Sequence, residues 1–197
     1  MDTSDAESTE APIFEIPAER PLLLAAGRLK PVKQFDRLIR AWVRADCGGS
    51  LVILGDGSQR AQLGTLIQEL DVSDRILLPG HESRMKPWLQ SATACIISSS
   101  REGFPYIMVE ALMTGCPVLS TPVSGVREFL PEQGIAASDS IEDLATLIRT
   151  NLSAPKVLTD SQRGSFLRAR EQLSLEAMVS KTEAFYRDLL ASTSTER

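Results

Sequence analysis

The chain alternates short apolar runs with segments of helical period, and this alternation constrains its fold more than any other feature. An uninterrupted apolar run bounded by turn residues is typical of a strand that is covered on both faces. Such runs occupy residues 22–26, 51–54, 76–78, 94–97 and 118–120, and a possible sixth occupies 134–137. If these strands are parallel, each connection between them needs a crossover segment, usually a helix.

Segments with apolar residues every three or four positions separate these runs. The clearest two contain Phe35, Leu38, Ile39, Trp42 and Val43, then Leu63, Leu66, Ile67 and Leu70. The pattern also predicts helices at 85–90 and 105–113, and a single helical turn at 125–130. A further helix begins with Ser140 as its cap, and two more lie within 159–190, with a break near 172–174. Strands that alternate with helices in this way predict an α/β fold with an open, Rossmann-like, doubly wound parallel sheet of about six strands.

The length of 197 residues and the 43% share of hydrophobic residues allow one or at most two domains with a real core. We assign residues 21–191 to one globular domain. Residues 1–20 are rich in Asp, Glu, Ser, Thr and Pro, and we interpret them as a mobile leader or an interdomain linker. Residues 192–197 form a tail.

The charges are mixed along the chain, with 21 basic and 26 acidic residues and a net charge of -5. This balance gives no field that would recruit nucleic acid. No apolar segment fits a signal peptide or a membrane-spanning helix. The three cysteines, Cys47, Cys95 and Cys116, form no Cys-x-x-Cys pair and are expected to be buried thiols. We therefore expect a cytoplasmic location.

Two loops carry candidate anion-binding groups. Arg28 and Lys33 follow the first strand closely enough to converge, and a guanidinium with an ammonium can clamp a diphosphate. The alternative is a pair of solvated surface cations. Residues 103–105 open a helix, whose free amides and dipole form a second anion site. The alternative there is a glycine that only turns the chain.

Two carboxylates, Glu102 and Glu110, flank the start of that helix. If most of the eight intervening steps are helical, the rise between them is about 12 Å. A pair of hydrolytic carboxylates needs roughly 5 to 9.5 Å, so this spacing better suits the two ends of an elongated ligand with vicinal hydroxyls. The alternative is that both are exposed glutamates that favour a helix start.

Several common sites are not encoded. His81 is the only histidine, so it cannot belong to a His-rich zinc site, and its setting favours a surface loop. The chain has no phosphate-binding Gly-x-x-x-x-Gly-Lys-Ser/Thr run, and Gly55-Asp56-Gly57 is followed by Arg60 where the dinucleotide fingerprint needs glycine. No Asp-x-Asp motif offers a metal to phosphates, so we expect neither a metal nor a cofactor.

Taken together, these motifs resemble the C-terminal, donor-binding domain of the retaining GT-B glycosyltransferases of family four, a group with many lipopolysaccharide, capsule and glycolipid transferases. The resemblance covers residues from about 21 to 191. Its first three loops are 27–36, 54–57 and 78–80. Its two-glutamate signature runs from Glu102-Gly103-Phe104-Pro105 to Glu110-Ala111-Leu112, followed by 115–118.

The resemblance implies a role for each loop. Arg28 and Lys33 would hold the diphosphate and stabilise the leaving group, and Glu102 would hold the donor sugar; these three are the predicted catalytic residues. Glu110 would bind the ribose, and residues 75–78 would present backbone groups to the base. The other predicted donor-binding residues are Gly27, Gly55, Asp56, Leu77, Leu78, Gly103, Phe104, Pro105 and Tyr106.

The sequence departs from the family pattern at two places. Ser98 stands where a proline is common, and we expect this change to be harmless. Val123-Ser124-Gly125 replaces the usual double glycine before Glu128, which argues against a close backbone approach to ligand at that loop.

In this family an acceptor-binding domain normally precedes the donor domain, and the resemblance implies that this chain lacks it. The resemblance therefore implies the donor-binding half of a transferase that uses a UDP- or GDP-type sugar in polysaccharide biosynthesis, inactive alone, with any peripheral membrane contact made through the missing half. In the family the final helix crosses back to that half, so apolar positions between 178 and 190 would lack a partner. The alternatives are a non-catalytic nucleotide-sugar binding module or partner subunit, or an epimerase or glycan phosphorylase of the same architecture.

Overall fold

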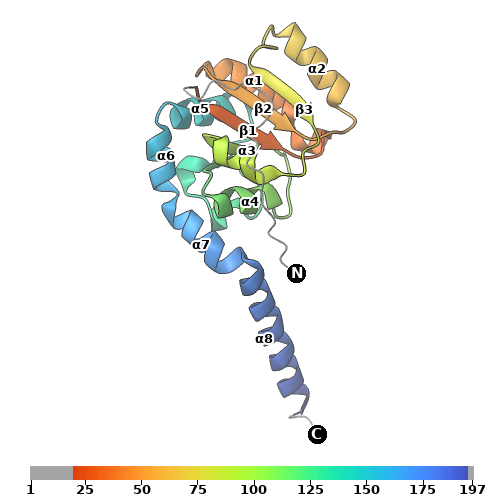
Figure 1. The fold of residues 1–197 in the computed structure, drawn as a ribbon, viewed down its shortest axis with the longest axis vertical. Coiled ribbons are helices and arrows are strands. Elements are labelled where there is room, and N and C mark those ends of the chain that lie inside the picture. The colour runs from red at the N-terminus through yellow and green to blue at the C-terminus, as the bar shows by residue number, and fades with distance from the viewer. Residues whose placement is uncertain (1–19, 195–197) are drawn as a thin grey trace, which may run out of the picture.

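The structure, a computed structural model, describes residues 20–194, with side chains described as far as residue 187. All but one residue of the predicted leader and the last three of the predicted tail lie outside this range. The described residues form a five-stranded, entirely parallel sheet in the order β3-β2-β1-β4-β5 (Figure 1). The strands are β1 (Leu22–Ala26), β2 (Ser50–Leu54), β3 (Ile76–Gly80), β4 (Ala94–Ile97) and β5 (Val118–Ser120).

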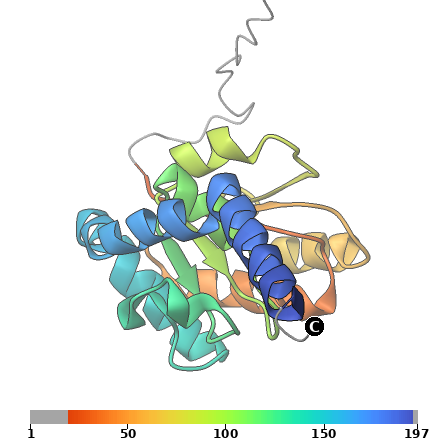
Figure 2. The same cartoon turned by 90° about the horizontal axis from the view of Figure 1, so that it is seen from below.

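Helices cover both faces of the sheet, as a doubly wound fold requires. One face carries α1 (Phe35–Ala45), α2 (Arg60–Glu69) and α5 (Ile141–Leu152). The other face carries α3 (Met85–Ser91), α4 (Tyr106–Thr114) and α7 (Arg163–Leu173), and Figure 2 shows the sheet between the two groups. The short helix α6 (Pro155–Ser161) links the two faces; the remaining elements are three 3-10 turns, η1 (Pro31–Lys33), η2 (Val126–Glu128) and η3 (Glu132–Gly134).

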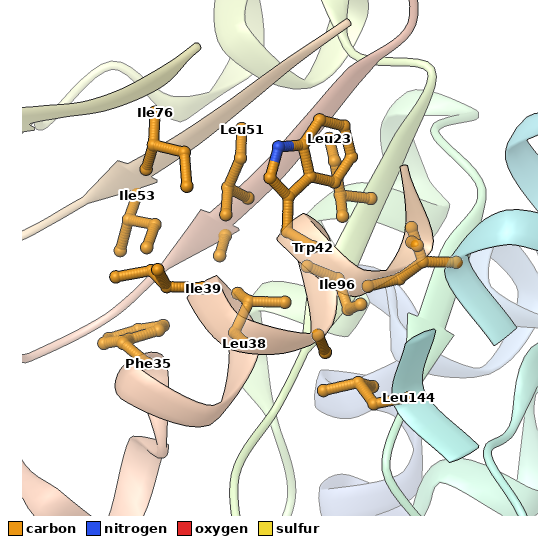
Figure 3. Close-up of a cluster of buried hydrophobic side chains, with 14 of the residues drawn as sticks. Leu23, Phe35, Leu38, Ile39, Trp42, Leu51, Ile53, Ile76, Ile96 and Leu144 are labelled. Carbon is orange, nitrogen blue, oxygen red and sulfur yellow. The ribbon is translucent and has the colours of Figure 1, made fainter. Parts of the chain in front are cut away.

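The strands divide their side chains between two hydrophobic clusters. Along β1, Leu23 and Ala25 face the α1 side, whereas Leu22 and Leu24 face the α4 side. All four are buried, because successive strand residues point to opposite faces and both faces are covered. Figure 3 shows the first cluster, in which Trp42 and its neighbours on α1 pack on the sheet. The uninterrupted apolar runs of the sequence are thus confirmed as buried strands.

Three details differ from the predicted fold. The run at 134–137 forms no sixth strand but a single bridge between Ile135 and Ser120. Helix α4 begins at Tyr106, one residue after Pro105, which is its N-cap. Helix α6 was not predicted. Only Leu158 among its residues is buried, and a single buried position gives no repeat of apolar residues from which a helix could be recognised. The Ser140 cap is confirmed, since its hydroxyl accepts a bond from the Asp143 amide at 3.1 Å.

The last helix, α8 (Leu175–Ser194), leaves the body of the domain (Figure 1). Its large apolar side chains within the described range are exposed, namely Leu175, Met178, Val179, Phe185 and Tyr186. Among residues 20–194, no helix has both the length and the apolar character needed to cross a membrane.

Candidate functional site: a crevice at the switch point of the sheet

The strand order reverses between β1 and β4, so the chain leaves these neighbouring strands toward opposite faces. In open α/β sheets, this divergence opens a crevice at the carboxyl ends of the strands. Two cavities of about 410 Å³ and about 280 Å³ lie there, and both are lined by Ala26, Gly27 and Met85. Because they share these residues, we describe them as one crevice with a larger and a smaller cavity.

Close backbone packing builds the floor of the larger cavity. Gly27 N–H donates to the Leu54 carbonyl at 2.9 Å, which joins the ends of β1 and β2. Gly55 has φ +134, and a Cβ there would lie 1.9 Å from the Gly27 carbonyl oxygen. Only glycine fits both the dihedral angle and the contact. The Gly55-Asp56-Gly57 segment, which fails the dinucleotide fingerprint, therefore brings two strand ends together.

Lys33 and Glu102 come from loops on the two sides of the switch point and meet in the smaller cavity. Lys33 Nζ lies 2.6 Å from Glu102 Oε1, and the two side chains are 24% and 15% exposed. The lysine stem passes over Gly27, where a Cβ would lie 3.2 Å from Lys33 Cε. Basic and acidic groups from the loops after β1 and β4 therefore meet in one cavity.

The other predicted cation, Arg28, lines the larger cavity with Gly55 and Asp56. Arg28 and Asp56 are both exposed, and Asp56 Oδ1 accepts a bond from the Gly57 amide at 2.7 Å. The structure thus divides the two cations between adjoining cavities, with Gly27 common to both.

Glu110 lines the smaller cavity together with Glu102. Partial burial raises the pKa of the Glu110 carboxyl above its ordinary value. The path between the two carboxylates is only partly helical, because α4 begins at Tyr106 and residues 102–105 form a loop. The carboxylates face one cavity from the loop and from the second turn of α4, so the 12 Å rise does not describe their separation.

The loop between them is shaped by packing. Phe104 forms an edge-to-face contact with Phe129, with ring centroids 6.0 Å apart, and a Cβ on Gly125 would lie 2.8 Å from the Phe104 ring. Phe104, Pro105 and Tyr106 line the smaller cavity, and Tyr106 is 81% exposed. A Cβ on Gly103 would meet no atom within 4 Å, so crowding does not demand glycine there.

Leu77 and Leu78 do not line either cavity. They lie within the edge strand β3, where Leu77 pairs with Val52 and the Leu78 carbonyl accepts a bond from Arg60 Nη2 at 2.8 Å. The larger cavity is instead lined by His81 and Glu82, which directly follow the strand. The sequence analysis did not include these two residues among the site residues, although their position directly after a strand could have indicated them. His81 is exposed, as expected, but it also lines the crevice.

Glu82 presents a charged group at the rim of the larger cavity. The Arg84 amide donates to Glu82 Oε1 at 2.8 Å, and this bond, with a weaker one from the Trp88 indole, holds the pKa of Glu82 below its ordinary value. The carboxylate is therefore ionised at neutral pH. In the part of the chain that the structure describes, no group of three or more His, Cys, Asp or Glu side chains is arranged as a metal site.

Comparisons with known proteins identify the class and then the family. The fold matches solved glycosyltransferases of the GT-B class. It superposes on sucrose-phosphate synthase of Thermosynechococcus elongatus with a TM-score of 0.80 and 24% identity over 90% of this chain and 47% of that one. Against TarM of S. aureus, solved with UDP, the TM-score is 0.77 and the identity is 19% over 89% of this chain and 36% of that one.

Residues 7–164 match the sequence profile of the glycosyl transferases group 1, and the chain belongs to this family of enzymes. It is 33% identical over 117 residues to the lipopolysaccharide core biosynthesis glycosyltransferase LpsE of Rhizobium meliloti, covering 59% of this chain and 34% of that protein. It is 24% identical over 185 residues to the N-acetyl-alpha-D-glucosaminyl L-malate synthase of Bacillus anthracis, covering 90% and 48%. The chain thus spans between a third and a half of these relatives.

Proposed function

We propose that this chain binds a nucleoside diphosphate sugar of the UDP or GDP type in the switch-point crevice and provides the donor side of a retaining glycosyl transfer. The observation that carries the proposal is the meeting of cations and carboxylates there: Lys33, Glu102 and Glu110 line one cavity, and Arg28 lines the next. A relative in fold, HepE of Anabaena, was solved in complex with UDP and glucose.

The proposed ligand lies along the crevice. Arg28 and Lys33 bind the diphosphate, because a guanidinium and an ammonium from one loop match its charge. Glu110 accepts hydrogen bonds from the ribose hydroxyls, and Glu102 accepts them from the sugar. The base occupies the larger cavity beside Glu82, and the open space at Gly103 lets the backbone of residues 103–106 approach the sugar.

In the proposed reaction, the bond between the sugar and the diphosphate breaks, the oxygen of the acceptor hydroxyl bonds to the sugar, and the hydroxyl proton passes to the departing diphosphate. Negative charge grows on the departing diphosphate, so Arg28 and Lys33 stabilise the transition state more than the ground state. Holding the sugar against Glu102 lowers the entropic cost of reaction. We propose that these cations do this without a metal ion.

We also propose that the acceptor, a glycan or lipid, is bound by a second unit that these 197 residues do not contain. The relatives are two to three times as long as the matched region, which supports a division of labour between two halves. On this view the chain alone binds donor and transfers nothing, and transfer returns when an acceptor-binding unit is added. Donor binding without restored transfer would favour a non-catalytic binding module.

Isothermal calorimetry with UDP, GDP, UDP-glucose and GDP-mannose tests donor binding. Glu110→Ala should weaken nucleotide binding about tenfold, because it removes charge-assisted hydrogen bonds. Glu69→Ala, which removes an exposed glutamate at the end of α2, is the matched control and should leave binding unchanged. The proposal fails if no nucleotide binds, or if the two variants bind alike.

A further inference from the structure

Three consecutive serines follow β4 and touch both halves of the lysine–glutamate pair. Ser98 and Ser99 are each 2% exposed, whereas Ser100 is exposed. A buried hydroxyl needs a hydrogen-bond partner, so the partners of these two side chains show what they hold in place.

Ser98 holds the backbone of Lys33. Its hydroxyl donates to the Lys33 carbonyl at 2.7 Å. Beside it, the Ser100 amide donates to the Val32 carbonyl at 2.9 Å. These bonds tie the segment after β4 to the 3-10 turn η1, which carries Lys33 into the crevice.

Ser99 holds the carboxylate of Glu102. Its hydroxyl donates to Glu102 Oε1 at 2.6 Å, the oxygen that also accepts from Lys33 Nζ at 2.6 Å. Ser99 is itself fixed from behind, because its carbonyl accepts a bond from the buried Thr121 hydroxyl at 2.7 Å. The chain of contacts therefore runs from the end of β5 to the ion pair.

We propose that Ser98 and Ser99 are positioning residues of the donor site: Ser98 fixes the backbone from which Lys33 reaches the diphosphate, and Ser99 keeps the Glu102 carboxylate aimed at the sugar. The inference rests on the proposed function and deepens it. A diphosphate competes with Glu102 for the Lys33 ammonium. When the Lys33 ammonium binds the phosphate instead of Glu102, the hydrogen bond from the Ser99 hydroxyl still holds the Glu102 carboxylate in place.

The two serines should affect different parts of the ligand, and calorimetry with UDP, GDP, UDP-glucose and GDP-mannose separates them. Ser99→Ala should weaken nucleotide-sugar binding about tenfold and binding of the bare nucleotide little, because its bond is to a charged group that meets only the sugar. Ser98→Ala should weaken both about fivefold, because it loosens the diphosphate contact. Ser98→Thr and Ser99→Thr, which keep the hydroxyl, should restore binding.

Ser100→Ala is the matched control. The Ser100 hydroxyl lies 3.3 Å from the Val32 carbonyl, and the stronger amide bond remains when it is removed, so binding should not change. A purely structural role for Ser99 predicts equal losses for nucleotide and nucleotide sugar together with a lower melting temperature. That result, or equal behaviour of the variants at positions 99 and 100, overturns the inference.

A readout without ligand separates this inference from the proposed function. The hydrogen-exchange rate of the Ser100 amide measures how often its hydrogen bond to the Val32 carbonyl opens, and this bond connects the segment after β4 to η1. Ser98→Ala should speed this exchange about fivefold, and Ser98→Thr should not. If the Ser100 amide exchanges equally fast in the wild type and in Ser98→Ala, the role of Ser98 is contradicted even if nucleotides bind. If exchange is faster in Ser98→Ala but the wild-type chain binds no nucleotide, only the proposed function is contradicted.

Discussion

At the scale of single residues, Glu110 combines a predicted binding role with a measurable cost in stability. Burial raises the pKa of its carboxyl in the folded chain above the ordinary value of the unfolded chain. The ionised form is thus disfavoured by folding, and this penalty is complete above the folded pKa and vanishes below the unfolded one. The ionised carboxylate that we propose to bind the ligand therefore lowers the stability of the free domain at neutral pH.

Glu110→Gln should accordingly raise the melting temperature by about 1 °C at pH 7, a small gain because the side chain is partly exposed. The gain in melting temperature should disappear as the pH falls below the ordinary glutamate pKa, because the Glu110 side chain is then as neutral as the glutamine that replaces it. Calorimetric melts of wild type and variant between pH 3.5 and 7 measure this difference. A gain that grows on acidification has the opposite sign and contradicts the assigned pKa direction.

The sequence was sufficient to place charged residues at strand ends but not to pair them. Lys33 and Glu102 each follow a predicted parallel strand, which puts both at the carboxyl edge of the sheet. Their direct contact depends on side-chain rotamers and on the Ser99 hydroxyl, which no periodicity reveals. Leu77 and Leu78 were linked to the base by family resemblance, whereas the structure lines the cavity with His81 and Glu82, which follow the end of β3.

At the scale of elements, the glycine turns after β1 and β2 set the geometry of the site. Gly55→Ala forces a Cβ to 1.9 Å from the Gly27 carbonyl, and we expect it to lower the free energy of unfolding by about 3 kcal/mol. Gly64, inside α2, would place a Cβ in open space, so Gly64→Ala should raise that free energy by about 0.5–1 kcal/mol. Urea unfolding measures both, and equal effects of the two substitutions contradict the packing described for Gly55.

Elements with a strong period were predicted well, and those held by few contacts were not. The Ser140 cap and the break between α7 and α8 follow from local chemistry. Residues 134–137 have strand-like composition, but 3-10 turn η3 ends at Gly134 and only Ile135 reaches the bridge with β5. Pairing beyond one bridge depends on where the tertiary fold carries the chain, which local propensity does not specify.

At the scale of the whole molecule, alternation predicted a parallel sheet but did not give its strand order. The order β3-β2-β1-β4-β5 puts the switch point between β1 and β4, and the crevice follows from that position. Helix α8 extends from the body with its described apolar residues exposed, consistent with the expectation that positions such as Met178 and Phe185 lack a partner within the domain.

The central claim is that one crevice at the switch point binds the nucleotide. The most direct measurement is a two-dimensional NMR titration of backbone amides with UDP and with GDP. The amides that should shift are those of the non-proline residues at the carboxyl ends of the strands, in 26–33, 55–57, 81–85 and 102–110. The amides at the opposite ends, in 46–49, 71–75 and 115–116, should stay fixed. Shifts confined to the opposite ends, or no shifts with either nucleotide, would contradict the account.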